Sequence, residues 1–152
     1  MDLKETFILG DAIDHHWYYQ SKSKAMKQLI KNVTASKILD IGAGSGFFSK
    51  QILMHSLAKE ATCVDISYEF DNDDFVNNKV ISFRRSVEYY AADLVLFMDV
   101  LEHVDDDVGL LESYIDKVPT GAHFLISVPA FQFLWSTHDI YLEHKRRYRL
   151  EE

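Results

Sequence analysis

The sequence predicts an α/β fold, with a doubly wound parallel sheet that carries helices on both faces. Two observations predict this class. Short apolar runs recur along the chain and are nearly continuous, as is typical of strands buried on both faces of a parallel sheet. Stretches with helical spacing lie between these runs, so that strands and helices alternate. A chain of 152 residues with 47% hydrophobic residues has the length and apolar content for one such domain.

Five apolar runs are the predicted strands. The five lie at 37–41, 61–66, 80–83, 93–100 and 123–128, and the run at 80–83 is the weakest. The polar, acidic stretch 71–78 is expected to be a surface loop.

Three segments carry helical features. The first 34 residues predict one or two helices. In 47–59 and 104–117, apolar residues recur so that they share one side of a helix. These residues are Phe48, Ile52 and Leu53 in the first of the two segments, and Val108, Leu111 and Ile115 in the second.

Composition excludes several classes of function. The net charge of −8 disfavours a nucleic-acid partner, because such binding depends on neutralising phosphates with Lys and Arg. A single cysteine, Cys63, cannot form an intrachain disulfide and fits a reducing compartment. No apolar run reaches the roughly 18–20 residues that span a bilayer, and no signal-peptide pattern opens the chain. We therefore expect a cytoplasmic protein without membrane insertion.

The strongest local signal is a hydrophobic strand that runs into three glycines and then into a helix. Gly42, Gly44 and Gly46 alternate with Ala43 and Ser45. Glycine at alternate positions permits a tight turn with positive φ and lets a ligand approach the backbone closely. The helix that follows presents its unpaired N–H groups toward the same place. The loop therefore indicates a ligand site, although some α/β folds use such a turn only to change direction.

Acidic residues near this loop narrow the choice of ligand. The G-x-G-x-G spacing differs from the G-x-G-x-x-G of dinucleotide-binding folds. Asp40 comes two positions before Gly42, where it would oppose a pyrophosphate but suits an ammonium or sulfonium group. Asp65 ends the next predicted strand, where a carboxylate can accept both hydroxyls of a ribose. A nucleoside with a positively charged substituent fits both acids.

These residues resemble the class I S-adenosylmethionine-dependent methyltransferases, in the branch that acts on small molecules and lipids. LDIGAGSG (39–46) is similar to the first motif of that family, and CVDIS (63–67) to its ribose-binding strand end. DLVLFMDVLEHV (93–104) and FLISVPA (124–130) resemble the fourth and fifth strands. HHWYYQSKSKAM (15–26) resembles a segment over the cofactor, and FLWSTHDIYLEHKRRYR (133–149) one that borders the substrate.

The resemblance implies a Rossmann-like parallel sheet with strand order 3-2-1-4-5 and an N-terminal helical lid. It divides a single domain, 1–152, into a helical segment (1–34), a cofactor-binding core (35–130) and a substrate-side segment (131–152). The family has two further strands, which this sequence is expected to lack. The fifth strand would then be an apolar edge that could pair with a second copy in a homodimer.

The resemblance also implies S-adenosylmethionine as cofactor, with S-adenosylhomocysteine as product. The candidate cofactor-binding residues are Asp40, Gly42, Ala43, Gly44, Gly46, Asp65, Ile66, Asp99, Val100, Trp17 and Tyr19. His138 is the preferred general base because an unperturbed imidazole titrates near neutrality, and His103 is the second catalytic candidate. No metal site is expected, since the histidines show no ligand spacing. The basic residues at 144–149 are either a solvated helix start or a site for an anionic substrate group.

The function that these features predict is transfer of a methyl group to a small-molecule, sugar or lipid-linked acceptor. Two alternatives stay open. One is an S-adenosylmethionine-binding module without activity, which the shortened chain makes plausible. The other is an NAD(P)-binding oxidoreductase domain, which the glycine spacing and Asp40 disfavour.

Overall fold

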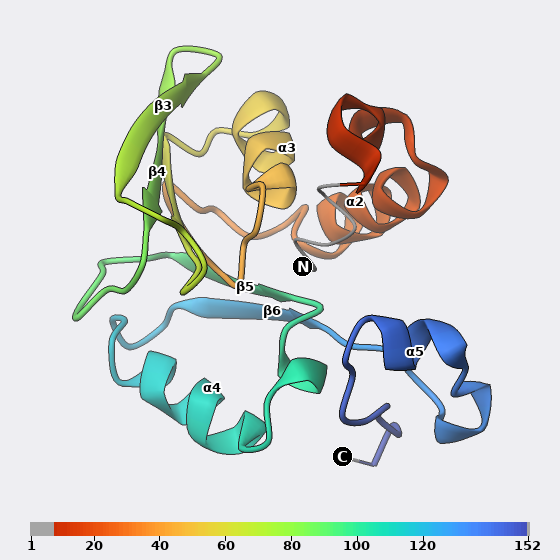
Figure 1. The fold of residues 1–152 in the computed structure, drawn as a ribbon. Helices are drawn as coiled ribbons and strands as arrows, with labels where there is room; N and C mark the ends of the chain where they lie inside the picture. The colour runs from red at the N-terminus through yellow and green to blue at the C-terminus, as the bar shows by residue number, and fades with distance from the viewer. Residues whose placement is uncertain (1–7, 152) are drawn as a thin grey trace.

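The computed structural model describes residues 8–151, with a six-stranded sheet at the centre (Figure 1). Its strands are β1 (Lys37–Ile41), β2 (Glu60–Val64), β3 (Asn72–Val76), β4 (Lys79–Arg84), β5 (Leu94–Met98) and β6 (His123–Ser127). Their spatial order is β3-β4-β2-β1-β5-β6, and all neighbouring pairs are parallel except β3 with β4. The five predicted strands therefore stand in the order 3-2-1-4-5, and the doubly wound α/β class is confirmed.

Helices cover both faces of this sheet (Figure 1). The helical elements are η1 (Gly10–His15), α2 (Trp17–Leu29), α3 (Phe47–His55), η2 (Leu101–His103), α4 (Asp107–Ile115), η3 (Gln132–Leu134) and α5 (Thr137–Tyr141). Helices α2 and α3 lie on one face and α4 lies on the other. The predicted apolar side of α3 is confirmed, because Phe48, Ile52 and Leu53 are all buried.

The central strand β5 explains why the apolar runs are continuous. Leu94, Leu96 and Met98 belong to the core beneath α2 and α3. Val95 and Phe97 alternate with them and belong to the core beneath α4. Because successive side chains of a strand point to opposite faces, a sheet covered on both faces needs apolar residues at every position.

Helix α4 buries only part of the side that the sequence predicted, because Leu111 is partly buried against the core but the other two residues are not. Val108 and Ile115 are exposed to 62% and 49%. Tyr114 is buried instead, together with Val118 and the partly buried Leu110. These three residues recur every four positions, which is also a helical spacing. Tyr114 packs edge to face against Phe97 of β5, with the ring centroids 5.8 Å apart.

The predicted surface loop at 71–78 is wrong, since this stretch contains β3 and the turn into β4. Asn77 and Asn78 both have positive φ, 52° and 61°, as the tight turn of a hairpin requires. Arg84 holds the pair together through Asp73, with Nη2 to Oδ1 at 2.6 Å. An Asn-Asn turn between two runs was the missed signal, because the acidic residues of β3 conceal its strand character.

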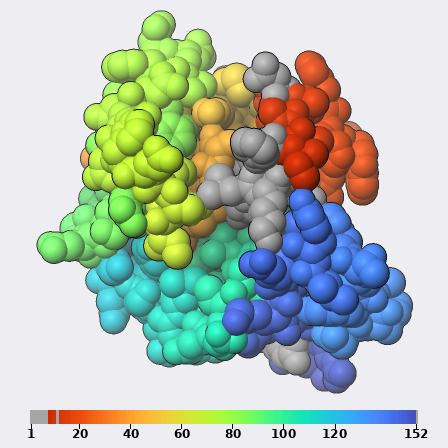
Figure 2. Space-filling view, viewed as in Figure 1, coloured from red at the N-terminus to blue at the C-terminus, as the bar shows by residue number. Residues whose placement is uncertain are grey.

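The carboxyl ends of the parallel strands define the edge where ligands bind in such folds. The glycine loop follows β1 there, Asp65 follows β2, and η2 follows β5. Beyond β6 the chain continues through η3 and α5, and Tyr148 forms a bridge beside Ala130. Figure 2 shows this C-terminal segment on the same side of the molecule as the N-terminal helices, away from the β3–β4 hairpin. No helix among the described residues is long and apolar enough to cross a membrane.

Candidate active site

The glycine loop adopts the backbone that its residues predict. Gly42, Gly44 and Gly46 have φ values of 61°, 55° and 70°. A Cβ added at Gly42 would lie 2.7 Å from Cγ2 of Val100, so the loop packs directly against the chain that follows β5. A side chain is therefore excluded at Gly42 on two grounds, the backbone conformation and the lack of space.

Asp40 lies beneath this loop and is almost fully buried. Its Oδ2 accepts a hydrogen bond from Oγ of Ser49 at 2.8 Å. Its Oδ1 has no partner among the described residues. Burial, with a smaller effect from the charge of Asp65, raises the pKa of this carboxyl to about 6 despite the lowering effect of the Ser49 hydrogen bond. A buried carboxylate with one oxygen that has no partner among the described residues fits a cationic ligand group.

Asp65 stands directly after β2 and faces the same loop. It accepts hydrogen bonds from the backbone N–H of Gly44 at 3.1 Å and of Ser67 at 3.0 Å, and from the Ser67 hydroxyl. Tyr68 donates its hydroxyl to the carbonyl of Gly44 at 2.6 Å, so the loop is held from two sides. The hydrogen-bond donors to Asp65 are therefore groups of the chain itself.

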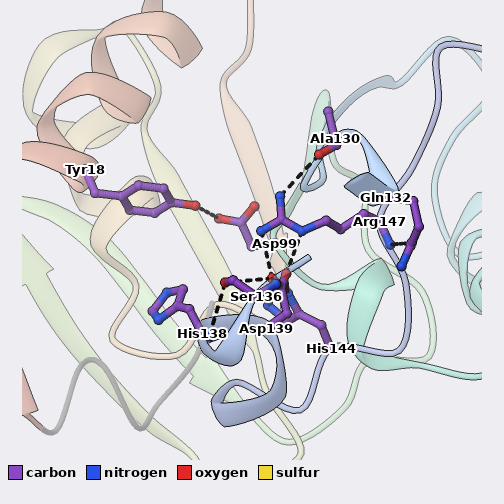
Figure 3. A network of polar contacts seen from close by, with 9 residues as sticks. All are labelled: Tyr18, Asp99, Ala130, Gln132, Ser136, His138, Asp139, His144 and Arg147. Carbon is purple, nitrogen blue, oxygen red and sulfur yellow. Dashed lines mark hydrogen bonds and ion pairs between the residues drawn. The ribbon is translucent and has the colours of Figure 1, made fainter. Parts of the chain in front are cut away.

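The other predicted cofactor residues lie along the same edge, except two. Ala43 is buried in the glycine loop, Ile66 is 84% exposed after β2, and Val100 is half-buried against Gly42. Asp99 ends β5 with a φ of 58° and forms an ion pair with Lys22. Figure 3 shows Tyr18 donating its hydroxyl to Asp99, at 2.9 Å. The two exceptions, Trp17 and Tyr19, belong to a neighbouring cavity.

That cavity has a volume of about 610 Å³ and lies beside Asp99. It is bounded by α2, by the chain after β5, by the end of β6, and by α5 with the segment that follows it. Trp17 borders it with 72% of its surface exposed, whereas Tyr19 is 1% exposed and also packs on Phe47. Both catalytic candidates, His103 and His138, line the cavity. The fold therefore brings together two histidines that are 35 positions apart in the sequence.

Asp139 of α5 is fully buried and holds two residues of the cavity wall, His144 and Arg147, in place (Figure 3). Arg147 donates to it through Nε at 2.7 Å and Nη2 at 2.9 Å, and Nδ1 of His144 lies 3.0 Å from Oδ1. The backbone N–H of Ser136 donates at 2.8 Å, which completes a capping box at the start of α5. Burial alone would raise the pKa of Asp139, but these donors hold it well below its usual range.

Sequence reasoning missed Asp139, although the Ser136–Asp139 spacing of a capping box was a visible signal. It also left open whether the basic residues at 144–149 bind an anion. In the structure Lys145 pairs with Asp105 at 2.7 Å and Arg146 with Asp107 at 3.2 Å. These residues do not start a helix, and three of their charges are used by carboxylates of the chain.

A further grouping was not predicted at all. Glu102 and His103 lie in the turn after β5, and His144 comes from the segment after α5. One ligand atom of each lies within 4.8 Å of the others. The sequence analysis expected no metal site because it considered only the spacing of ligands along the chain. That spacing could not show that His144 lies next to His103, which is 41 positions away in the sequence.

The comparisons with known proteins agree with this geometry. A family model described as a methyltransferase domain matches residues 14–151. No curated protein matches the chain. Among solved structures, N-methyltransferase NodS from Bradyrhizobium japonicum WM9, in complex with S-adenosyl-L-homocysteine, superposes with a TM-score of 0.65. It is 14% identical, and the match covers 93% of this chain and 82% of NodS.

Two further structures have similar folds. The methyltransferase domain of bacterial CtHen1 superposes with a TM-score of 0.61 at 19% identity, covering 87% of this chain and 78% of that domain. A putative O-methyltransferase from Nostoc punctiforme superposes at 0.63 with 18% identity, covering 86% of this chain but only 46% of its own length. The chain belongs to the methyltransferase domain family, and its resemblance to the class I S-adenosylmethionine-dependent methyltransferases is confirmed.

The site fits the cofactor of this class, S-adenosylmethionine. A cationic ligand group suits the buried Oδ1 of Asp40, which has no partner among residues 8–151. The left-handed glycine turn brings main chain rather than side chains to the edge of the sheet. When bound, the cofactor supplies an activated methyl group on a sulfonium.

Proposed function

We propose that this domain transfers a methyl group from S-adenosylmethionine to a small-molecule, sugar or lipid-linked acceptor bound in the 610 Å³ cavity. The observation that carries the proposal is the position of Asp99, which ends β5 between the glycine loop and this cavity. A cofactor on the loop and an acceptor in the cavity would meet there. Because the leaving group is neutral, the main task of the protein is to align the two reactants.

Each side chain has a defined part in this proposal. Asp65 accepts hydrogen bonds from the ribose hydroxyls, which replace some of those that it now accepts from Ser67. Asp40 faces the cationic end of the cofactor. Ile66 and Val100 contact the apolar parts of the cofactor, and Trp17 and Tyr19 close the cavity from α2. His138 is the general base for acceptors that must lose a proton. It is exposed at the start of α5, and its ring points away from Asp139 (Figure 3).

The remaining assignments follow from the sequence and the fold together. We keep 35–130 as the cofactor-binding core and 131–152 as the substrate-side segment, and extend the role of 1–34 from a cofactor lid to the acceptor cavity that α2 borders; residues 1–7 and 152 lie outside the described part of the chain. The buried, lone Cys63 supports a reducing, cytoplasmic location. The net charge of −8 supports an acceptor other than a nucleic acid.

The test of cofactor identity is a thermal-shift and calorimetry panel of S-adenosylhomocysteine, S-adenosylmethionine, NAD and NADP. We expect stabilisation by the first two only, because a ligand stabilises the state that it binds. Asp65→Ala should weaken binding of S-adenosylhomocysteine by about 1–3 kcal/mol, the usual effect of unpaired polar partners. Glu69→Ala removes an exposed charge nearby and is the matched control. Equal stabilisation by NAD would reject the methyltransferase reading in favour of an oxidoreductase.

The test of the acceptor side is His138→Ala, measured with an acceptor found by screening. Turnover should fall by roughly 10²–10⁴, the usual contribution of a general base, while the Kd of S-adenosylhomocysteine stays unchanged. His55→Ala, at the end of α3, is the control for loss of a surface histidine. A parallel loss of cofactor affinity would place His138 in the wrong site. A domain that binds the cofactor but methylates nothing in the screen would support a binding module.

A further inference from the structure

Glu102, His103 and His144 form a cluster at the wall of the acceptor cavity. The rings of His103 and His144 meet edge to face, with their centroids 4.8 Å apart. The backbone N–H of Lys145 donates to the carbonyl of Glu102 at 2.7 Å, which fixes the C-terminal segment against the turn after β5. The cluster is therefore built by two segments that the main chain itself holds together.

Glu102 is the unusual member of this cluster. Its side chain is 1% exposed, and neither carboxylate oxygen has a hydrogen-bond partner among the described residues. Burial, followed by the neighbouring charge of Asp99, raises the pKa of Glu102 to about 7. A buried carboxylate without donors is costly, and proteins normally pair such a group or use it as a metal ligand. The nearest ligand atoms that the cluster offers are the two imidazoles.

His144 is oriented as a metal-binding histidine would be. Its Nδ1 lies 3.0 Å from Oδ1 of the fully buried Asp139, as Figure 3 shows. A carboxylate on one ring nitrogen holds the proton there and leaves the other nitrogen as an acceptor or ligand. Histidines that bind metals almost always make this second contact, which raises their basicity. Arg147 and Ser136 fix Asp139 in turn, so the ring has little freedom to rotate.

We propose that Glu102, His103 and His144 bind one divalent transition-metal ion that faces the acceptor cavity. Two imidazoles and one carboxylate suit Mn²⁺, Fe²⁺, Co²⁺ or Zn²⁺ better than Mg²⁺ or Ca²⁺, which prefer oxygen ligands. Ligands about 2.1 Å from a tetrahedral centre lie about 3.4 Å apart. The ligand atoms now lie within 4.8 Å of one another, so metal binding requires Glu102 and His103 to move toward the fixed ring of His144. Three protein ligands leave coordination positions open for an acceptor.

The use of this ion in catalysis rests on the proposed function, whereas its binding does not. An acceptor hydroxyl bound to a divalent ion has a lowered pKa and loses its proton more readily. His103 would then act by holding the ion rather than by direct contact with the methyl group. The acceptors that this site favours are those with an oxygen able to coordinate a metal.

The experiment measures metal binding with neither cofactor nor acceptor present, so that its outcome is independent of methyl transfer. The chelator-treated protein is titrated with Mn²⁺, Co²⁺, Zn²⁺ and Mg²⁺ by calorimetry, and Co²⁺ binding is followed by its visible absorbance. We expect one equivalent of Co²⁺ or Zn²⁺ with a Kd below about 100 μM. Glu102→Gln and His144→Ala should each weaken binding at least about tenfold.

Two controls separate this site from chance binding and from unfolding. His123→Ala and Glu112→Gln remove exposed residues of the same types elsewhere, and both should bind the metal as the wild type does. Glu102→Gln should keep the wild-type melting temperature without metal, because it replaces a buried, unpartnered carboxylate with a neutral amide, yet lose the rise in melting temperature that metal produces. Absence of binding to the wild type, or equal binding by Glu102→Gln, would overturn the proposal. A loss of metal affinity in His123→Ala equal to that in His144→Ala would also overturn the proposal.

Discussion

At the scale of single residues, the acids along the carboxyl edge differ in what compensates their charge. Asp65 has backbone N–H donors, Asp99 has Lys22, and Asp139 has Arg147. Asp40 and Glu102 are buried with oxygens that lack a partner among residues 8–151, and burial raises the pKa of both, to about 6 and about 7. Our two proposals assign a cation to each of these acids, the ammonium end of the cofactor to Asp40 and a divalent ion to Glu102.

A pH dependence of cofactor affinity follows from Asp40. Below about pH 6 this carboxyl is mostly protonated in the free protein, whereas a bound ammonium group favours the ionised form. Binding therefore releases a proton in this range, and affinity should rise with pH until Asp40 is ionised without ligand. We expect S-adenosylhomocysteine to bind about tenfold more tightly at pH 7 than at pH 5, measured by calorimetry.

Asp40→Asn is the decisive variant for this prediction. The amide cannot ionise, so its affinity should be weaker at pH 7 and nearly constant between pH 5 and pH 7. Asp74→Asn, on the exposed strand β3, is the control and should retain the wild-type slope. A slope that persists in Asp40→Asn would assign the titration to another group.

At the scale of elements, the glycine loop is the centre of the proposed cofactor site. Both main-chain polar groups of Gly44 are used, the N–H by Asp65 and the carbonyl by Tyr68. Gly44→Val should abolish binding of S-adenosylhomocysteine while most of the fold survives. A branched side chain would occupy the space that the ligand takes, and the left-handed φ adds about 1–2 kcal/mol of strain. Calorimetry and circular dichroism measure the two effects.

Gly121→Val separates the loss of ligand space from backbone strain. Gly121 also has a positive φ, 94°, and a Cβ there would meet no heavy atom within 4 Å. It precedes β6, at the opposite end of the strands from the glycine loop. This variant should lose similar stability and keep the wild-type affinity. If Gly44→Val bound S-adenosylhomocysteine with a Kd within a few-fold of that of the wild type, the loop would be only a structural turn.

At the scale of the whole molecule, β6 forms one edge of the sheet described here. Ile126 is 39% exposed on this strand, and Phe131 and Phe133 beyond it are 44% and 82% exposed. The bridge between Ala130 and Tyr148 covers the chain only after β6 has ended. An apolar edge of this kind pairs readily with another chain. We therefore predict that the protein forms a homodimer through β6.

Light scattering across a concentration series measures this association. A dimer should be present at about 100 μM, where even interfaces of about 5–6 kcal/mol are populated. Ile126→Lys should shift the protein to monomer, because a charged side chain on an edge strand opposes pairing. Val108→Lys, on the exposed side of α4, is the control. A wild-type monomer at this concentration would show that the edge is not an interface.

Local sequence determined most of the fold and the backbone of the proposed cofactor site. Continuous apolar runs indicated strands buried on both faces, and Gly42, Gly44 and Gly46 indicated a left-handed turn. Both could be predicted because they depend on residues that are neighbours in the chain. The same reasoning failed where two local patterns competed. In α4, packing against the sheet buried the stripe containing Tyr114 and left Val108 and Ile115 of the predicted one exposed.

The tertiary structure alone brought together the residues of the proposed acceptor site. His144 meets Glu102 and His103 because β5 and the C-terminal segment converge at one edge of the sheet, and no spacing along the chain encodes that contact. Burial likewise makes Glu102 an acid with a raised pKa and Asp139 one with a lowered pKa, although the sequence shows only two carboxyl groups. Charge and its compensation depend on distance in space, and the fold sets that distance.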